Sequence, residues 1–566
     1  MNHLGKALLV TLALASATAT FGQQDKNKQS GEVPKGWHLL DRTKDGYYGI
    51  SVDKAYEFIQ TKNLKGKTVI VAVIDSGIDT LHEDLKDVLW RNPKEISGNG
   101  IDDDGNGYVD DIYGWNFLGN KDGRNVKQDS YEGARVYHSL KEKYAGKEID
   151  MASLNADQVA EYKMWLRSKE KIEGDSGPGM DLSLLKRAYN AAARSDSILR
   201  ATMKKDTFTG NDLEKFEPTN AAEKGAKGSL LYFFKAQEQM EGTNTDFLES
   251  FSDFLSGEER KAESKEKAPP NYRADIVGDD YNDINDKYYG NGDVMASTPM
   301  HGTHVAGIIG ATRDNKKGMD GVADNVKIMM IRAVPDGDEH DKDIALGIRY
   351  AVDNGARVIN MSFGKDFSPQ KKWVDEAVQY AESKGVLLVH AAGNDGKNID
   401  SAHNFPNAML TTTKTRAPNW ITVGASGDPK AGGITASFSN YGKEEVDVFA
   451  PGVRIYSTLP GKTTYGNLQG TSMASPVVAG AAAFLMSYFP HLTPQQVKYC
   501  IESSAHVPDM KVRKPGSGDM VSLTEISKNG GLINLYEAAK IASTLQSGDK
   551  VKENKSVQPT LKNKRG

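Results

Sequence analysis

The pattern of apolar and polar residues along this chain predicts a sheet with helices between its strands. Continuous apolar runs that end in polar or glycine residues are typical of buried parallel strands. Five such runs cover residues 68–77, 325–334, 355–364, 385–394 and 419–426. Segments with helical periodicity cover 304–312, 341–355, 371–385 and 475–489. This alternation predicts an α/β fold in which helices cover both faces of a parallel sheet.

The alternation is interrupted between residues 120 and 290, where lysine, glutamate, aspartate and serine are abundant. Apolar residues within 157–172, 181–205 and 228–240 nevertheless keep a helical period. Because a disordered linker would show no such period, we expect a mainly helical insertion over 120–290. The α/β domain would then consist of residues 67–119 and 291–543.

The two ends of the chain differ from the rest. Lys6 precedes an apolar run from Ala7 to Ala15, and small residues follow, which is typical of a cleaved secretory signal over residues 1–22. The run is too short to remain as a membrane span. We expect an N-terminal extension over 23–66, a disordered tail over 544–566, and an exported protein that is periplasmic or extracellular.

Composition limits the classes of function. The 566 residues are 38% hydrophobic and 26% charged, which suits a globular protein of about two to four domains. A net charge of −5 without a dense basic block argues against nucleic-acid binding. Cys500 is the single cysteine, so no intramolecular disulfide can form. Stability outside the cell would have to come from packing or from metal ions.

Four polar residues lie where predicted strands end or predicted helices begin. Asp75 ends the first strand and Asn394 follows a later one, while His301 and Ser472 each precede a helix. Serine nucleophiles need a base, an acid that orients the base, and a donor to the oxyanion, and these residue types supply them. A hydroxyl at the start of a buried helix lies at its positive end, and Pro476 suits the first turn. Taken singly, each residue has an ordinary explanation as a turn former or helix cap.

Together these segments resemble a known family. VIDSGID, HGTHVAG, AAGND and GTSMASP resemble the motifs of the subtilisin-like serine proteases, and they occur in that family's order of Asp, His, Asn and Ser. The resemblance covers about residues 67–115 and 295–540, and it implies a subtilisin-like parallel sheet. It also implies an exported endopeptidase in which Asp75 orients His301, His301 is the general base, Ser472 attacks the peptide, and Asn394 binds the oxyanion.

The resemblance extends to the binding of a protein or peptide substrate. Ser362, Phe363 and Gly364 resemble the segment that pairs with the peptide as an added edge strand. Ala391, Ala392 and Gly393 resemble the wall of the pocket for the residue that precedes the cleaved bond. Small residues there would leave room for a sizeable side chain.

Three alternatives remain open at this stage. The two histidines of HGTH suggest zinc ligands, but a third ligand and the glutamate of an HExxH motif are missing, so zinc is disfavoured. A second alternative is a catalytically silent binding protein on the same fold. A third is a peptide ligase that uses the same three residues with an amine as acceptor.

An acidic loop predicts a structural calcium site. Oxygen ligands at alternate positions can surround one hard cation where glycines allow the bend. In the segment 102–110 the predicted ligands are Asp102, Asp104, Asn106, Tyr108 and Asp110, as in the first nine positions of an EF-hand loop. The twelfth position is Tyr113 and not glutamate, so a bidentate ligand would have to come from elsewhere, with Asp111 as a candidate. An acidic turn in solvent is the alternative, and no cofactor is needed for the chemistry itself.

The insertion separates the Asp and His motifs by far more residues than the family usually has between them. It would therefore lie beside the cleft, where it either restricts access, acts as a lid or binds an unknown partner, or else is a peripheral decoration. The extension before residue 67 is also short for the folding propeptide of the family.

Overall fold

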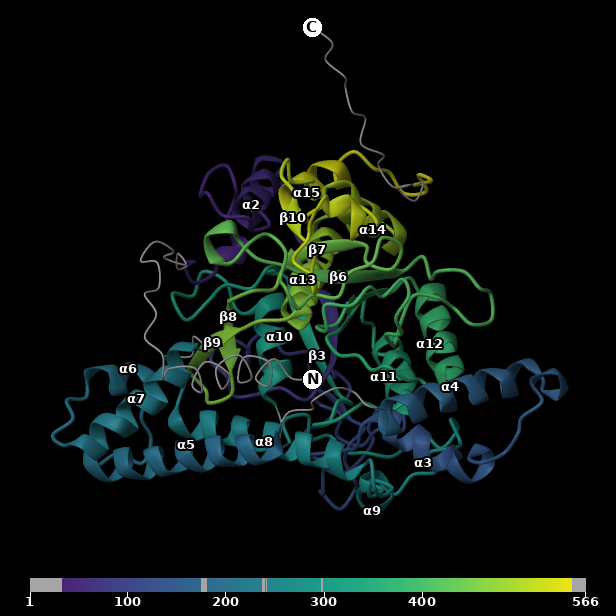
Figure 1. Ribbon diagram of the computed structural model, residues 1–566. Helices are drawn as coiled ribbons and strands as arrows, with labels where there is room; N and C mark the ends of the chain where they lie inside the picture. Colours follow the sequence, from purple (N-terminus) through teal and green to yellow (C-terminus); the bar gives the residue numbers. More distant parts are fainter. Residues whose placement is uncertain (1–32, 175–180, 237–239, 241, 297–298, 552–566) are drawn as a thin grey trace, which may run out of the picture.

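Seven parallel strands form the central sheet (Figure 1). The computed structural model describes residues 33–174, 181–236, 240, 242–296 and 299–551, so the predicted signal over 1–22 and most of the predicted tail lie outside the described residues. The strands are β1 (Val69–Asp75), β2 (Gly114–Asn116), β3 (Val326–Arg332), β4 (Val358–Met361), β5 (Leu387–Ala391), β6 (Trp420–Ser426) and β7 (Val448–Pro451), in the order β2-β3-β1-β4-β5-β6-β7. The predicted α/β fold is confirmed, although the sequence analysis missed β2 and β7.

The sheet separates two hydrophobic layers. In β1, Val71 and Val73 pack in one layer with helices α10 (Met300–Gly310) and α13 (Thr471–Tyr488). The alternate residues Ala72 and Ile74 pack in the other layer with α11 (Asp341–Asp353) and α12 (Lys371–Ser383). Because helices cover both faces, the strands show continuous apolar runs in place of an apolar-polar alternation.

Helix α13 is the central buried helix of the molecule. Every residue from Thr471 to Ser487 is buried. A Cβ atom added at Gly480 would lie 2.7 Å from the Cβ of Val322, so a larger residue would clash there. The run of glycine and alanine in this segment therefore lets neighbouring elements approach its backbone closely.

The segment before the sheet folds onto the same body. Trp37 is 1% exposed and its indole donates to the Val453 carbonyl at 3.1 Å. Tyr56 contacts Phe484 of α13 with ring centroids 4.9 Å apart. The described part of the extension is thus packed against the core. The remaining elements outside the insertion are η1 (Trp37–Leu39), α2 (Val52–Thr61), η3 (Pro429–Ala431), β8 (Ile455–Leu459), β9 (Thr464–Leu468), α14 (Pro494–Ser503), β10 (Val512–Arg513), β11 (Met520–Val521), η4 (Leu523–Glu525) and α15 (Leu535–Ala542).

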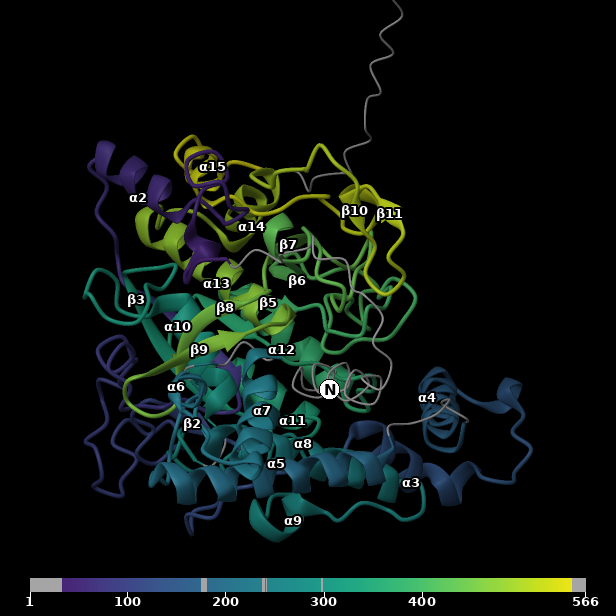
Figure 2. The same ribbon diagram turned by 60° about the vertical axis from the view of Figure 1, so that its left-hand side comes forward.

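The predicted insertion is mainly helical. Its helices are α3 (Glu132–Tyr144), η2 (Met151–Ser153), α4 (Ala156–Glu173), α5 (Leu182–Met203), α6 (Gly210–Lys215), α7 (Ala221–Ala236), α8 (Asn244–Glu263) and α9 (Tyr272–Ile276). In Figures 1 and 2 they form a layer along one side of the sheet, with α5 to α8 toward one end and α3 and α4 toward the other. Helices α5 to α8 enclose a small core of their own, which includes Leu185, Phe208, Leu230, Phe247 and Phe251.

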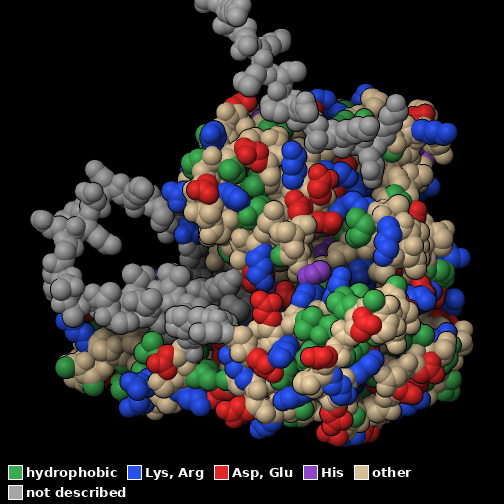
Figure 3. Space-filling view, turned by 45° about the vertical axis from the view of Figure 1, so that its right-hand side comes forward, with side chains coloured by type: hydrophobic (Ala, Val, Ile, Leu, Met, Phe, Trp, Pro, Cys, Tyr) green, Lys and Arg blue, Asp and Glu red, His purple; other side chains and the backbone are tan. Residues whose placement is uncertain are grey.

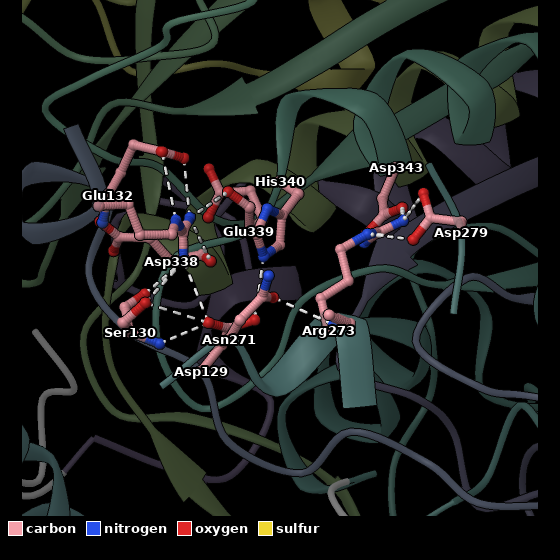
Figure 4. Close-up of polar contacts among 12 residues, drawn as sticks. Asp129, Ser130, Glu132, Asn271, Arg273, Asp279, Asp338, Glu339, His340 and Asp343 are labelled. Carbon is pink, nitrogen blue, oxygen red and sulfur yellow. Dashed lines mark hydrogen bonds and ion pairs between the residues drawn. The ribbon is translucent and has the colours of Figure 1, made fainter. Parts of the chain in front are cut away.

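The two ends of the insertion meet at the sheet. Asn116, the last residue of β2, and Asn291 exchange backbone hydrogen bonds of 2.9 and 3.1 Å. Buried polar contacts add to this closure: Arg273 forms an ion pair with Asp343 of α11 at 2.6 Å, and His340 is hydrogen-bonded to Asp129 at 2.9 Å (Figure 4). The insertion is therefore fixed to the loop that follows β3, while the domain boundaries themselves stay a prediction.

None of the helices formed by the described residues combines the length and the apolar character that crossing a membrane requires.

Candidate active site

Asp75 and His301 meet at the carboxyl end of β1. Asp75 is the last residue of the strand and His301 is the second residue of α10, and their Oδ1 and Nδ1 atoms are 2.7 Å apart. A Cβ atom at Gly302 would lie only 2.2 Å from the Gly77 carbonyl oxygen. Glycine at 302 is therefore what allows α10 to approach the loop after β1 closely enough for this contact.

The environment of this pair favours a charged imidazole. The side chain of Asp75 is 2% exposed and that of His301 is 35% exposed. Burial alone would lower the pKa of His301, but the charge of Asp75 and its hydrogen bond outweigh burial and raise the pKa above the usual 6.5. With Nδ1 bonded to Asp75, the other ring nitrogen, Nε2, is the one that can accept a proton.

Ser472 lies at the start of α13 and is linked to Ser362. Its hydroxyl donates to the Ser362 carbonyl at 3.0 Å, and the Ser362 hydroxyl donates to the Ser472 carbonyl at 2.9 Å. Pro476 explains the second bond, because it has no N–H to donate to the carbonyl four residues earlier. The expectation that Pro476 lies in the first turn is wrong: α13 begins at Thr471, so the proline lies inside the helix.

None of the hydrogen bonds among the described residues joins Ser472 to His301. Helices α10 and α13 pack against each other, and each contributes one of the two residues from its first turn. A rotation of the Ser472 side chain between staggered positions would free its hydroxyl from Ser362. Catalytic hydrogen bonds are often long or misaligned without substrate, so this arrangement is compatible with a nucleophile at rest.

Asn394 is oriented by the residue that precedes Ser472. Its side-chain oxygen accepts from the Thr471 backbone N–H at 2.9 Å and from the Thr471 hydroxyl at 3.0 Å. The same hydroxyl accepts from the Gly393 N–H at 3.0 Å. Because these bonds fix the oxygen end of the amide, the Nδ2 donor is turned away from Thr471. This role of Thr471 is not evident from the sequence, because it depends on a contact between segments 77 residues apart.

Ser362, Phe363 and Gly364 extend β4 beyond its last paired residue. The Phe363 carbonyl accepts from His390 at 2.8 Å, whereas the exposed Gly364 has no backbone hydrogen bond among the described residues. An N–H and a carbonyl that face solvent at a strand end are what an added peptide strand requires.

Two further asparagines complete the walls near the site, and sequence reasoning missed both. Asn404 donates to the Ala392 carbonyl at 3.2 Å, and its oxygen would lie 3.0 Å from a Cβ atom at Gly364. It therefore lies between the two predicted walls, Ser362–Gly364 and Ala391–Gly393. Asn440 donates to the same Ala392 carbonyl at 2.9 Å and accepts from Asp395 and Lys397. Asparagine is common in loops, so neither residue stands out in the sequence.

The side chains of His304 and His301 do not point toward a common metal position. Its Nε2 lies 3.1 Å from the Gly466 carbonyl oxygen, and burial lowers its pKa to about 3. A histidine that points to a backbone carbonyl while its neighbour points to Asp75 does not form a zinc site with it. Cys500 is buried, and burial raises its thiol pKa to about 12, so it is unreactive.

The acidic loop gathers a ligand set that differs from the predicted one. Carboxylate oxygens of Glu95, Asp102 and Asp104 lie within 4.8 Å of one another, which suits a hard cation that prefers oxygen ligands. Glu95 is not part of the sequence motif and was missed. Asp110 instead accepts from the backbone N–H groups of Gly98 and Gly100 at 2.7 and 2.8 Å.

Two further candidate ligands, Asn106 and Asp111, are used within the protein. The Asn106 oxygen accepts from the Tyr108 N–H at 2.8 Å. Asp111, the candidate bidentate ligand, is buried and accepts from Asn92 at 2.7 Å and from Tyr350 at 2.5 Å. Burial raises the Asp111 pKa to about 6. Glu95, Asp102 and Asp104 also accept from backbone N–H groups, but their carboxylates lie close enough together to share one cation. If the loop holds a cation, these three residues are the ones that would bind it.

Comparison with known proteins places this chain in a family. A model of the subtilase family, Peptidase_S8, matches residues 66–530. Subtilisin DY from Bacillus licheniformis is 41% identical over 207 residues, which cover 36% of this chain and 70% of that relative. The thermophilic serine proteinase of Bacillus sp. (strain AK1) is 46% identical over 188 residues, which cover 33% of this chain and 42% of that relative. A solved protease structure from Pseudoalteromonas arctica covers 91% of this chain and 100% of its own, with 20% identity and a TM-score of 0.43.

The chain therefore belongs to the subtilase family and is a subtilisin-like serine protease. The resemblance stated from its four motifs is confirmed. Its substrates are accordingly peptides or proteins.

Proposed function

We propose that this protein is an exported endopeptidase that hydrolyses peptide bonds through an acyl-enzyme on Ser472. The observation that carries the proposal is the 2.7 Å contact between Asp75, at the end of β1, and His301 of α10. Helix α10 packs against α13, which bears Ser472. A base held by a buried acid beside a helix-terminal hydroxyl is the arrangement that serine hydrolysis requires.

In the proposed mechanism, the peptide binds along Ser362, Phe363 and Gly364 as an added strand, with the wall Ala391–Gly393 beside its side chain. The Ser472 hydroxyl turns from the Ser362 carbonyl to His301, loses its proton to Nε2 and attacks the scissile carbonyl. Asp75 stabilises the imidazolium that forms. His301 then gives the proton to the leaving amine, and water releases the acyl group by the reverse steps.

The oxyanion of the tetrahedral intermediate is bound by the Asn394 amide and the Ser472 backbone N–H. The bonds from Thr471 support this role, since they fix the amide before substrate arrives. Donors fixed in advance need no reorganisation during the reaction, which is where most of their benefit lies.

The direct test is the Ser472→Ala variant. Wild type should react with a fluorophosphonate probe and cleave casein and peptide libraries, whereas the variant should do neither while keeping the same thermal unfolding profile. Cleavage that survives in the purified variant would refute the assignment. Neither the silent binding protein nor the ligase has support in the site or the relatives, and the masses of the products separate hydrolysis from ligation.

We also propose that the loop at Glu95, Asp102 and Asp104 binds a structural calcium ion. Three carboxylates gathered at one surface loop repel one another unless a cation is present, which supports the proposal. Export is proposed on the sequence of residues 1–22, which has the pattern of a secretory signal. N-terminal sequencing of the mature protein and cell fractionation would test it, and full-length protein retained in the cytoplasm would contradict it.

A further inference from the structure

A hollow of about 310 Å³ lies where the insertion meets the loops beside the proposed cleft. This volume is within the range of side-chain and small-ligand pockets. Its charged and aromatic lining residues come from three segments: Arg167, Glu170 and Lys171 from α4, Asp366 and Phe367 after the peptide-pairing segment, and Lys397 and His403 after Asn394.

The hollow is joined to the two walls of the cleft through short backbone connections. Lys365 and Phe405 exchange backbone hydrogen bonds of 2.9 and 2.8 Å, one residue beyond Gly364. Asn404 donates to the Ala392 carbonyl at 3.2 Å. The run from His403 to Phe405 thus links one wall to the other, and His403 at its start lines the hollow.

A buried ion pair holds the insertion in this position. The Lys365 side chain is 1% exposed, and its Nζ lies 2.8 Å from Glu132 of α3 and 2.8 Å from Asp341. Glu132 is held in turn by Arg135 at 2.7 Å. Since α3 packs along α4, this network fixes α4 relative to the peptide-pairing segment.

Most charges around the hollow are already paired. Lys171 forms an ion pair with Asp366, and Lys397 lies 3.8 Å from Asp366 and 3.6 Å from Asp395. Figure 3, which faces the α4 side, shows basic and acidic side chains interspersed without a large patch of one sign. Attraction of a charged substrate would therefore depend on a local unpaired group and not on the overall field.

Among the described residues, Arg167 and Glu170 of α4 are the two charged lining residues that form no ion pair, and Arg167 is the one that can attract an acidic group. Its guanidinium lies 5.0 Å from the centre of the Phe367 ring, and among the described residues it has no ion pair and no hydrogen bond. Burial lowers the Arg167 pKa, with Asp366 opposing the change. A partly buried guanidinium has five N–H donors in a fixed planar arrangement that matches a carboxylate.

We propose that Arg167 of the insertion binds an acidic side chain of the substrate in this hollow, so that the enzyme prefers peptides with glutamate or aspartate close to the cleaved bond. This inference rests on the proposed function, because it requires a peptide bound along Ser362 to Gly364. It makes the insertion part of the substrate site and not a peripheral decoration.

The test uses the full-length enzyme and matched peptides that differ only by glutamate, glutamine or lysine at each position near the cleaved bond. Wild type should show a kcat/KM about 10–100-fold higher for glutamate than for glutamine at one position, as expected for a charge-assisted hydrogen bond. Arg167→Gln should remove that preference and change the rate on the glutamine peptide by less than about twofold. Arg167→Glu should shift the preference toward lysine at the same position.

Arg194→Gln, on the exposed face of α5, is the matched control and should keep the preference. Thermal unfolding of each variant shows whether the fold is intact. Equal cleavage of all three peptides by wild type, or an unchanged preference in Arg167→Gln, would overturn this inference while fluorophosphonate labelling still supports the protease. Absence of both labelling and cleavage would overturn the proposed function, and this inference with it.

Discussion

The Asn394 amide is held from its oxygen end by both the backbone and the hydroxyl of Thr471. We expect Asn394→Ala to lower kcat on the order of 10²–10³, the loss found for the corresponding donor of subtilisin, with KM nearly unchanged. Thr471→Val should lower kcat less, because the Thr471 N–H still holds the amide. Steady-state kinetics on one peptide measure both effects.

Thr413→Val, which alters an exposed loop hydroxyl, is the matched control and should leave kcat unchanged. A Thr471→Val enzyme with wild-type kcat would show that the hydroxyl does not orient the amide.

The pH profile should report His301. The general base must be neutral, and Asp75 raises the His301 pKa, so kcat/KM should rise with pH through a value above the usual 6.5. Asp75→Asn removes the charge that raises the pKa but leaves burial, which lowers it. The acidic limb of the profile should therefore move to lower pH, while kcat falls by about 10⁴, the loss found for the same change in a chymotrypsin-like protease. An acidic limb that stays in place would mean that another group controls it.

At the scale of single residues, the positions of Asp75, His301, Asn394 and Ser472 at strand ends and helix starts were predictable, because the ends of apolar runs are visible in the sequence. Thr471, Asn404 and Asn440 were not, since their roles arise from contacts between loops that are distant in sequence. Glu95 was missed for the same reason: it joins Asp102 and Asp104 only after the loop folds back.

At the scale of elements, the Lys365 ion pair connects α3 of the insertion to the end of the peptide-pairing segment. We expect Lys365→Met to destabilise the protein by about 3–5 kcal/mol, because it leaves Glu132 and Asp341 buried without their common partner. Urea or thermal unfolding monitored by circular dichroism measures the change.

Lys186→Met removes an exposed pair with Glu259 and serves as the comparison, with a change of about 0–1 kcal/mol. Equal stability of the Lys365→Met enzyme and wild type would show that the buried network does not hold the insertion.

Helical periodicity predicted the insertion and its helical character, because apolar spacing is a local property. The placement of the insertion was not predictable. It depends on buried pairs such as Arg273 with Asp343 and Asp129 with His340, and charged residues in a sequence give no sign of which will be buried. The short strands β2 and β7 lack an apolar run long enough to identify them.

For the whole molecule, stability without disulfides should depend on the proposed cation. Adding calcium to the chelated enzyme should raise its melting temperature, by an amount equivalent to about 2.7 kcal/mol at a calcium concentration 100 times the Kd. Autolysis should slow in parallel, since cleavage requires local unfolding. Differential scanning calorimetry with EDTA and with calcium measures the first effect, and gel analysis over time measures the second.

Asp102→Asn should abolish the response to calcium, whereas Asp122→Asn, in an exposed turn where the carboxylate binds Arg124, should keep it. Identical melting curves in EDTA and in calcium would argue against any structural cation.

The bridge between Asn116 and Asn291 has an evolutionary consequence. Because an isolated bridge joins Asn291 to the end of β2, the segment between these two residues leaves and rejoins the domain at one point, and we expect that it can be exchanged between homologous genes with the sheet unchanged. A donor segment would have to bring its own partners for the buried groups that remain in the recipient: a carboxylate for Lys365, a cation for Asp343 and an acceptor for His340. Grafts that meet this condition should give active hybrid enzymes with altered preferences, and grafts that do not should fail to accumulate.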